Sequence, residues 1–240
     1  MKLVPSGQVA PWVWWLGGVS ALLLVAGAWQ VAVSGPFVAA DWRFHLWAEA
    51  GMPTGIGKWL LDEFASVTGE RLFTLPVLGI LAAWLTLRDR DWRPLVVVLA
   101  GLATIAVIGY GIKFGLGRTM PWTGVDVLHG GGRAWPSGHA ANAAYTWAMA
   151  GILLIGEGGL RPRPRLMAPW MIVSGLVALA SGWIMALVDY HWLSDIPGGW
   201  VLGLLALAVS CGLLQAARPM PVHAAWVLRL RERVLARRRR

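Results

Sequence analysis

Charged side chains are scarce in this sequence. Asp, Glu, Lys and Arg make up 14% of its 240 residues, whereas hydrophobic residues make up 57%. A soluble domain of this size carries about a quarter of charged residues. The apolar residues also stand in long uninterrupted runs, and runs of about 18 or more indicate helices that span a bilayer. The composition therefore excludes a soluble globular domain.

Cysteine is almost absent as well. The only one, Cys211, lies inside an apolar run, so the chain has neither an intramolecular disulfide nor a thiolate metal cluster. The sequence also has no acidic or histidine cluster of the kind that usually binds metal. We therefore expect no metal and no cofactor.

Six apolar runs are free of Asp, Glu, Lys and Arg. Backbone groups in hydrocarbon must be hydrogen-bonded internally, so these runs have to be helices. The first run is too long for a cleavable signal peptide and is expected to be retained. The prediction is an all-α, polytopic membrane bundle with one membrane-embedded domain over residues 1–240. The six predicted spans are Val9–Val33, Leu72–Leu87, Leu95–Ile112, Ala140–Ile155, Leu166–Val188 and Ile196–Ala217.

The net charge of +9 comes from basic residues in the segments between spans, which argues against nucleic acid as a partner. Most Lys and Arg residues fall on one side of the predicted bundle, including a basic tail from about residue 218. By the positive-inside rule both termini are cytoplasmic, and the loops after spans three and five face outward.

The long outer segment between spans one and two contains a helical pattern. Apolar residues recur at helical spacing from Ile56 to Val67, with Lys58, Asp62 and Glu63 between them. This pattern fits a helix in the membrane interface. A helix that caps the bundle fits equally well.

Three polar clusters fall on the predicted outer side: Lys113–Pro121, Arg133–His139 and Asp189–Asp195. Ionisable residues next to membrane spans are costly and usually functional. Three separate stretches that meet at one face of a helix bundle can form a site there.

The second cluster reads as the start of a helix. Ser137 can cap that helix, and the free N–H groups near Ser137 and Gly138 would attract a phosphate. His139 would then stand beside the phosphate and could donate a proton. A simple cap with a histidine at headgroup level explains the same residues.

The third cluster pairs His191 with Asp195, four residues apart. A carboxylate beside an imidazole fixes its tautomer and makes the other ring nitrogen a competent nucleophile or base. Ser194 and Pro197 look like a helix start, so the contact is made either down one helical face or across a turn.

Cationic residues near these clusters are candidates for binding phosphate oxygens. Lys113 leaves span three, although a lysine there could simply snorkel to the interface. Arg118 follows in a Gly-rich loop, and Arg133 precedes the second cluster; both could supply charge to a phosphate.

Taken in order, Lys113…Pro121, Pro136-Ser-Gly-His139 and His191-x-x-x-Asp195 resemble the three signatures of the type 2 phosphatidic acid phosphatase superfamily, which are membrane lipid phosphatases and their relatives. Two positions depart from the family pattern. Where K-x6-R-P has its arginine this chain has Met120, and where S-R-x5-H-x3-D has Ser-Arg it has Ile184 and Met185. Methionine can neither carry charge nor donate hydrogen bonds.

The resemblance implies a lipid phosphatase in the plasma membrane, the inner membrane of a bacterium, with its site on the outer face. His191 would attack the phosphorus, Asp195 would orient it, and His139 would protonate the leaving oxygen. The expected substrate is an isoprenoid or glycerolipid phosphate or diphosphate, such as undecaprenyl diphosphate. Phosphotransfer and a non-catalytic, lipid-binding relative are the alternatives; a transporter ranks last, because the spans carry no charged residue at mid-membrane.

Overall fold

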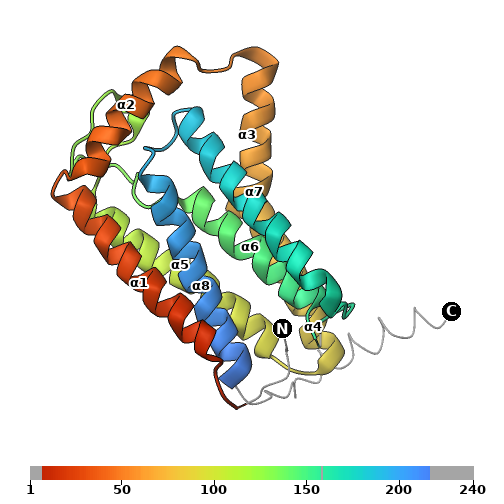
Figure 1. Cartoon of the computed structure of the whole chain (residues 1–240). Coiled ribbons are helices and arrows are strands. Elements are labelled where there is room, and N and C mark those ends of the chain that lie inside the picture. Colours follow the sequence, from red (N-terminus) through yellow and green to blue (C-terminus); the bar gives the residue numbers. More distant parts are fainter. Residues whose placement is uncertain (1–6, 158, 217–240) are drawn as a thin grey trace.

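The computed structural model describes residues 7–157 and 159–216, and the basic tail predicted from about residue 218 lies outside this range. The described residues form a bundle of α-helices (Figure 1). The helices are α1 (Pro11–Ala32), α2 (Pro36–Ala50), α3 (Gly55–Gly69), α4 (Arg71–Asp89), α5 (Arg93–Leu116), α6 (Gly138–Ile155), α7 (Met167–Leu187) and α8 (Asp195–Ala216), with 3₁₀ turns at Pro121–Thr123 and Pro164–Leu166.

Each of the six apolar runs is a helix, so the all-α prediction is confirmed. Five stretches of the described chain are long and apolar enough to cross a membrane, and α6 is not among them. Helix α6 is rich in Ala and Gly, and most of its side chains are buried by other helices rather than exposed. Its composition suits close contact with protein instead of contact with lipid.

Helix α6 lies at the centre of the bundle, with its main contacts to α7, α8 and α4. Glycines let α8 approach it closely: a β-carbon on Gly199 would collide with the Ser137 carbonyl, and one on Gly203 with the Ala141 carbonyl. This is the close packing expected from a small-xxx-small face. It brings the start of α8 against the start of α6.

The segment between α1 and α4 contains two helices, where the sequence predicts one. Helix α3 matches the predicted pattern and packs against α6 and α7, as the capping alternative describes. Helix α2 was not predicted. Two of its three buried residues, Asp41 and His45, are polar, so polar contacts hold it in place and hydrophobic periodicity does not reveal it.

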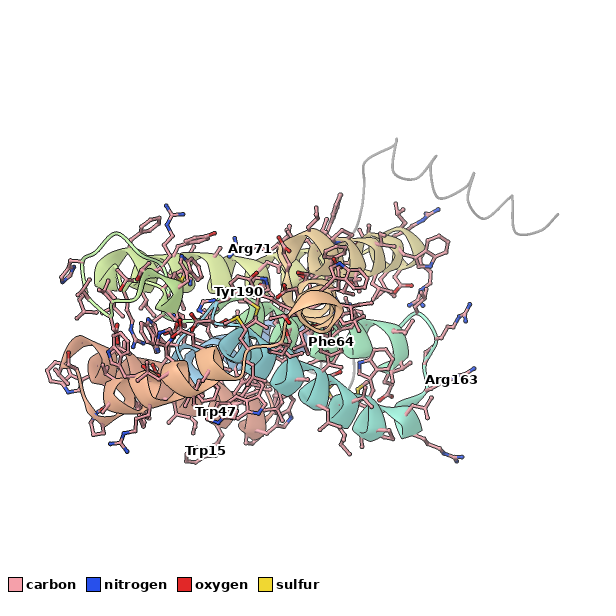
Figure 2. All side chains as sticks on the ribbon, turned by 90° about the horizontal axis from the view of Figure 1, so that it is seen from above. Trp15, Trp47, Phe64, Arg71, Arg163 and Tyr190 are labelled. Carbon is pink, nitrogen blue, oxygen red and sulfur yellow. The ribbon has the colours of Figure 1, made fainter. Side chains whose placement is uncertain are left out.

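The two ends of the bundle differ in charge. The α4–α5 turn carries Arg88, Arg90 and Arg93, and the α6–α7 connection carries more arginines. Figure 1 shows both connections at the end of the bundle opposite the α5–α6 and α7–α8 loops. Large apolar side chains cover the outside, such as Trp15 and Trp47 (Figure 2). The chain is an integral membrane protein.

Candidate active site

The N-terminus of α6 is capped as the sequence predicts. Ser137 is the N-cap residue, and its Oγ accepts a hydrogen bond from the Ala140 N–H at 3.3 Å. The Ser137 N–H donates to the Asp195 carbonyl at 2.9 Å, which joins this segment to the start of α8. His139 lies in the first turn of α6, beside the N–H groups that the helix leaves unpaired.

His191 and Asp195 are in contact, as predicted. The His191 Nδ1 lies 3.1 Å from the Asp195 Oδ2, and the same oxygen accepts the Trp192 N–H at 2.9 Å. Because α8 begins at Asp195, the contact crosses a turn rather than running down one helical face. Burial lowers the pKa of His191, and its hydrogen bond to Asp195 opposes that change. Burial therefore favours the neutral form of the imidazole.

The two histidines share a cavity of about 330 Å³. It lies among α3, α6, the C-terminal end of α7, the α5–α6 loop and the α7–α8 loop. Both methionines that stand at motif arginine positions also line it, so their side chains occupy places that arginine would make cationic. The lining residues are Asp62, Ser66, Met120, Trp122, His139, Met185, Tyr190 and His191.

Lys113 lies in the last turn of α5, and its side chain is buried. The helix continues to Leu116, beyond the predicted end of the span. The Lys113 Nζ donates to the carbonyl of Arg133 and, at 3.4 Å, to that of Ala134. Lys113 therefore holds the segment that leads into α6.

Arg118 is placed differently from the sequence prediction. The side chain is 1% exposed, and its Nε and Nη2 donate to the two Asp126 oxygens at 2.8 and 2.7 Å. Nη2 also donates to Asp41 at 2.6 Å, and Nη1 donates to Ser194 and Asp195 at 2.9 and 3.0 Å. These contacts use all five donors of a guanidinium. None is left for a substrate phosphate, because Arg118 is occupied by three buried carboxylates.

Arg133, the other predicted substitute, is exposed and does not line the cavity. Its guanidinium lies over the Phe114 ring, 5.1 Å from the centroid. The structure therefore brings His139, His191 and Asp195 together but gives Arg133 a different position.

Several site residues were missed because they lie on α3 and α4, away from the motifs. Asp62 and Ser66 of α3 line the cavity, and Lys58 pairs with Asp62 at 2.9 Å. Arg71, the first residue of α4, lies near the start of α6. The helical pattern from Ile56 to Val67 predicted α3 itself, but no sequence signal predicted which segment it faces.

A second histidine–carboxylate pair adjoins the site. The His45 Nδ1 of α2 lies 2.6 Å from the Asp189 Oδ1, and the His45 ring packs edge-on against Trp192. Burial raises the pKa of Asp189, and the hydrogen bond from His45 opposes that change. This pair fastens α2 to the loop that carries His191.

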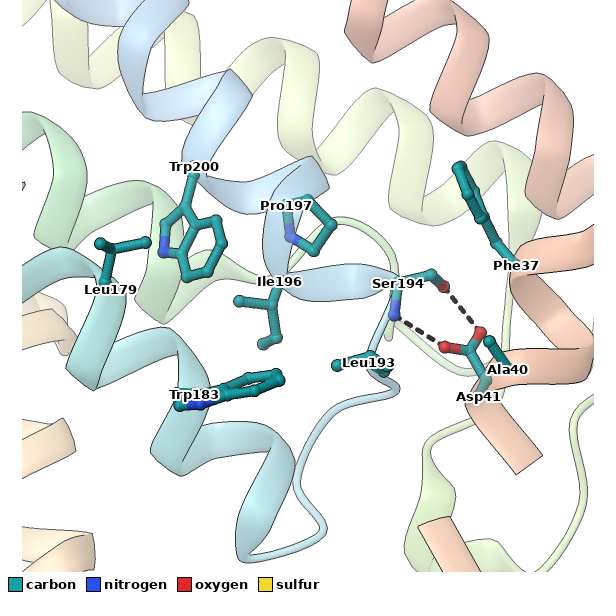
Figure 3. A pocket seen from close by; sticks show the side chains of 10 residues that line it. All are labelled: Phe37, Ala40, Asp41, Leu179, Trp183, Leu193, Ser194, Ile196, Pro197 and Trp200. Carbon is teal, nitrogen blue, oxygen red and sulfur yellow. Dashed lines mark hydrogen bonds between the residues drawn. The ribbon is translucent and has the colours of Figure 1, made fainter. Parts of the chain in front are cut away.

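A larger cavity, of about 470 Å³, contains neither His139 nor His191. It is an apolar groove between α2, α7 and the start of α8 (Figure 3). At its one polar end the Ser194 N–H and Oγ both donate to Asp41, each at 2.7 Å. The chemistry of the site therefore belongs to the smaller cavity.

Comparison with known proteins agrees with this geometry. The family model of the PAP2 superfamily matches residues 94–219, more than half of the chain. The chain therefore belongs to the PAP2 superfamily, as the motif order predicts, and is a membrane phosphatase of that family.

The comparison of sequences and the comparison of structures each matched a phosphatase of Bacillus subtilis. The chain is 26% identical to phosphatidylglycerophosphatase B of strain 168 over 149 residues, which are 61% of this chain and 71% of the relative. The crystal structure of a transmembrane PAP2-type phosphatidylglycerolphosphate phosphatase superposes with a TM-score of 0.65 at 20% identity. That match covers 82% of this chain and 94% of the other, and it supports the fold.

Proposed function

We propose that this protein hydrolyses a lipid phosphate through a phosphohistidine intermediate. The observation that carries the proposal is the shared cavity of His139 and His191, with Asp195 bound to the far side of one ring. A nucleophile whose tautomer is fixed, opposite a second imidazole that can carry a proton, is what covalent phosphoryl transfer requires.

In the first step the His191 Nε2 forms a bond to phosphorus, and the bond from phosphorus to the lipid oxygen breaks. Burial lowers the pKa of His139 to about 4 in the free protein. The negative charge of a bound phosphate raises that pKa, and His139 then gives its proton to the departing oxygen. The Nδ1–H of His191 donates to Asp195, which stabilises the positive charge that the ring acquires. In the second step water attacks the phosphorus, His139 takes the proton of the water, and the N–P bond breaks to release phosphate.

The N-terminus of α6 supports this scheme from the other side of the cavity. The Ser137 N–H is bound to the Asp195 carbonyl, so the N–H groups of Gly138 and His139, together with the positive end of the helix dipole, stabilise negative charge on the phosphoryl oxygens. Lys113, held on the carbonyls of Arg133 and Ala134, adds positive charge behind the same segment.

The substrate class we propose is a glycerolipid or isoprenoid phosphate or diphosphate. The apolar exterior of the bundle and the phosphatidylglycerophosphatase relative support a lipid. The arginines at the opposite end of the bundle support an arrangement in which the site faces the outer side of the membrane.

The test is phosphate release by the full-length protein in detergent, in the presence of a chelator. Phosphatidylglycerophosphate, phosphatidate and an isoprenyl diphosphate serve as substrates. We expect His191→Ala to reduce release to background and to lose the acid-labile phosphoenzyme that rapid quenching traps in the wild type. His129→Ala removes an exposed histidine outside the cavity and is the matched control. Undiminished release by His191→Ala would refute the mechanism.

The alternative is a non-catalytic relative that binds a lipid phosphate, and Met120 and Met185 are the observation that favours it. Both line the cavity and neither can bind phosphate oxygens. Under this alternative the wild type is silent, and arginine at both positions creates activity. Turnover by the wild type eliminates it. Mass spectrometry of the products distinguishes hydrolysis from transfer to a lipid or sugar hydroxyl.

A further inference from the structure

The cavity that holds the two histidines has few cations directed at it. Met120 and Met185 take the places of two arginines. Arg118 has every donor occupied by Asp41, Asp126, Ser194 and Asp195. A phosphoryl group in transit develops charge on its oxygens, and a cationic donor in a fixed position is the usual means of stabilising it. Another side chain would have to supply that donor here.

Arg71 is placed to do so. Its Nη2 lies 4.0 Å from the position that a β-carbon on Gly138 would occupy, which is the start of α6 where the phosphate is expected. In the view from above, Arg71 lies toward the middle of the molecule, as does Tyr190 of the cavity wall (Figure 2).

The guanidinium of Arg71 is held in place by one contact, and some of its hydrogen-bond donors remain free in the part of the chain that the structure describes. Its Nη1 donates to the Tyr110 hydroxyl at 2.7 Å, and the group lies 5.0 Å from the centroid of the same ring. Within the described residues Nη2 and Nε have no hydrogen-bond partner, in contrast to the nitrogens of Arg118. An arginine with one edge anchored and two donors open can accept a phosphate in a two-point contact.

The chain positions Arg71 by a close approach two residues earlier. A β-carbon on Gly69 would lie 2.8 Å from the His139 carbonyl and 2.9 Å from the Ser181 Oγ, so only glycine lets the end of α3 come this near. The helix breaks at Glu70, where ψ is 145°, and α4 starts at Arg71. The break turns the first side chain of α4 toward the start of α6.

Two other cationic side chains near the site are less suited to bind a phosphate. Lys58 is paired with Asp62 at 2.9 Å and lies 4.9 Å from the centroid of the Tyr190 ring. Arg133 is exposed and stacked on Phe114.

We propose that Arg71 is the phosphate-binding cation of this site and takes the place of the arginines that Met120 and Met185 replace. The inference rests on the proposed function for its catalytic consequence, but phosphate binding by Arg71 can be measured without turnover. Arg71 belongs to α4, a helix outside the three motifs, and it lies beside the start of α6 rather than among the residues that line the cavity.

The experiment compares full-length Arg71→Met with the wild type in detergent, using phosphate release and orthovanadate binding as separate readouts. We expect kcat/KM to fall ~10²–10³-fold, as for other positioned donors, and the Kd for vanadate to rise. Arg71→Lys retains the positive charge but loses the two-point hydrogen bonding of the guanidinium. We expect its kcat/KM and its Kd for vanadate to lie between those of the wild type and of Arg71→Met. Arg163→Met, at an exposed position at the other end of the bundle, is the matched control and stays at wild-type values.

Rescue separates binding from a merely structural role. Adding Met185→Arg to Arg71→Met places a guanidinium in the cavity wall and should restore vanadate binding and part of kcat/KM. Tyr110→Phe leaves the Arg71 charge in place and removes only its anchor, so it causes a smaller loss. Unchanged vanadate affinity in Arg71→Met, or a loss that no arginine at position 185 restores, would overturn the inference. Vanadate binding that depends on Arg71 in a protein that releases no phosphate would instead refute the proposed hydrolysis.

Discussion

The cluster around Arg118 and the cavity of the two histidines are neighbouring polar regions, and they differ in how completely their polar groups are paired. In the Arg118 cluster, which consists of Arg118, Asp41, Asp126, Ser194 and Asp195, every arginine donor has an acceptor at 3.0 Å or less. In the cavity of the two histidines, the Asp62 Oδ1 is buried without a partner among the described residues.

The contrast separates the groups that hold the site from the groups that are open to a ligand. A buried cation surrounded by carboxylates has no capacity left, and its contribution is to fix three segments in place: α2, the α5–α6 loop and the start of α8. Unpaired polar groups in a cavity are costly. A hydrogen-bond donor on a ligand, such as a hydroxyl group, would pair with the Asp62 oxygen and remove that cost, whereas a phosphate oxygen would not. Asp195 belongs to both regions, because one oxygen accepts from Arg118 and the other from His191.

The largest expected effect comes from the residue that joins the two regions. Asp195→Asn keeps the shape but removes the charge that orients and stabilises the His191 ring. We expect kcat to fall on the order of 10³- to 10⁴-fold. The hydrogen bond and charge of Asp195 both raise the pKa of His191. Any residual activity should therefore have its acid limb at lower pH than in the wild type, since the neutral imidazole persists to lower pH.

The measurement is a pH profile of phosphate release for both proteins. Asp126→Asn is the matched control, because it removes a carboxylate from the same Arg118 cluster without touching His191. If Asp126→Asn loses as much rate as Asp195→Asn, the two regions are not functionally separate.

A smaller effect, on the stability of the protein, is expected from a substitution in the Arg118 cluster. Arg118→Met leaves Asp41, Asp126 and Asp195 buried without their cation, and such losses destabilise by about 3–5 kcal/mol. Thermal unfolding in detergent should show a lowered Tm, and the control Arg163→Met should not. A Tm equal to that of the wild type would mean that the cluster does not hold the segments together.

The smallest effect on stability and activity is expected at the end of α3, where Gly69 lies against His139. In Gly69→Ala the new β-carbon would crowd the His139 carbonyl and the Ser181 Oγ, and overpacking of this kind costs about 1–3 kcal/mol. Gly79→Ala in α4 meets nothing within 4 Å and is the matched control. We expect a lowered Tm and slower phosphate release only for Gly69→Ala. Equal behaviour of the two variants would show that the approach of α3 to His139 is not tight.

The prediction of helices at the six apolar runs succeeded because lipid imposes a strong rule on sequence, although five stretches rather than six qualify as candidate spans in the described chain. Apolar runs without charge must be helices in a bilayer, and their bounds agree with α1 and α4 to α8 within a few residues. Helix α2 escaped prediction because its inward face includes Asp41 and His45, so its attachment is polar and leaves no hydrophobic period. The cap at Ser137 and the contact of His191 with Asp195 were predictable because both are local in sequence.

The sequence by itself determined the helices, the three motifs and the local pairs, since each follows from composition or from residues close along the chain. The tertiary structure decided which cations face the cavity. Arg118 is five residues from Lys113, but its guanidinium binds carboxylates of α2, the α5–α6 loop and α8 instead of facing the cavity. No local sequence pattern relates these carboxylates to Arg118. Arg71 reaches the start of α6 because Gly69 lets α3 approach it. Such distant pairings depend on how helices pack, and helix packing is not a property of any one segment.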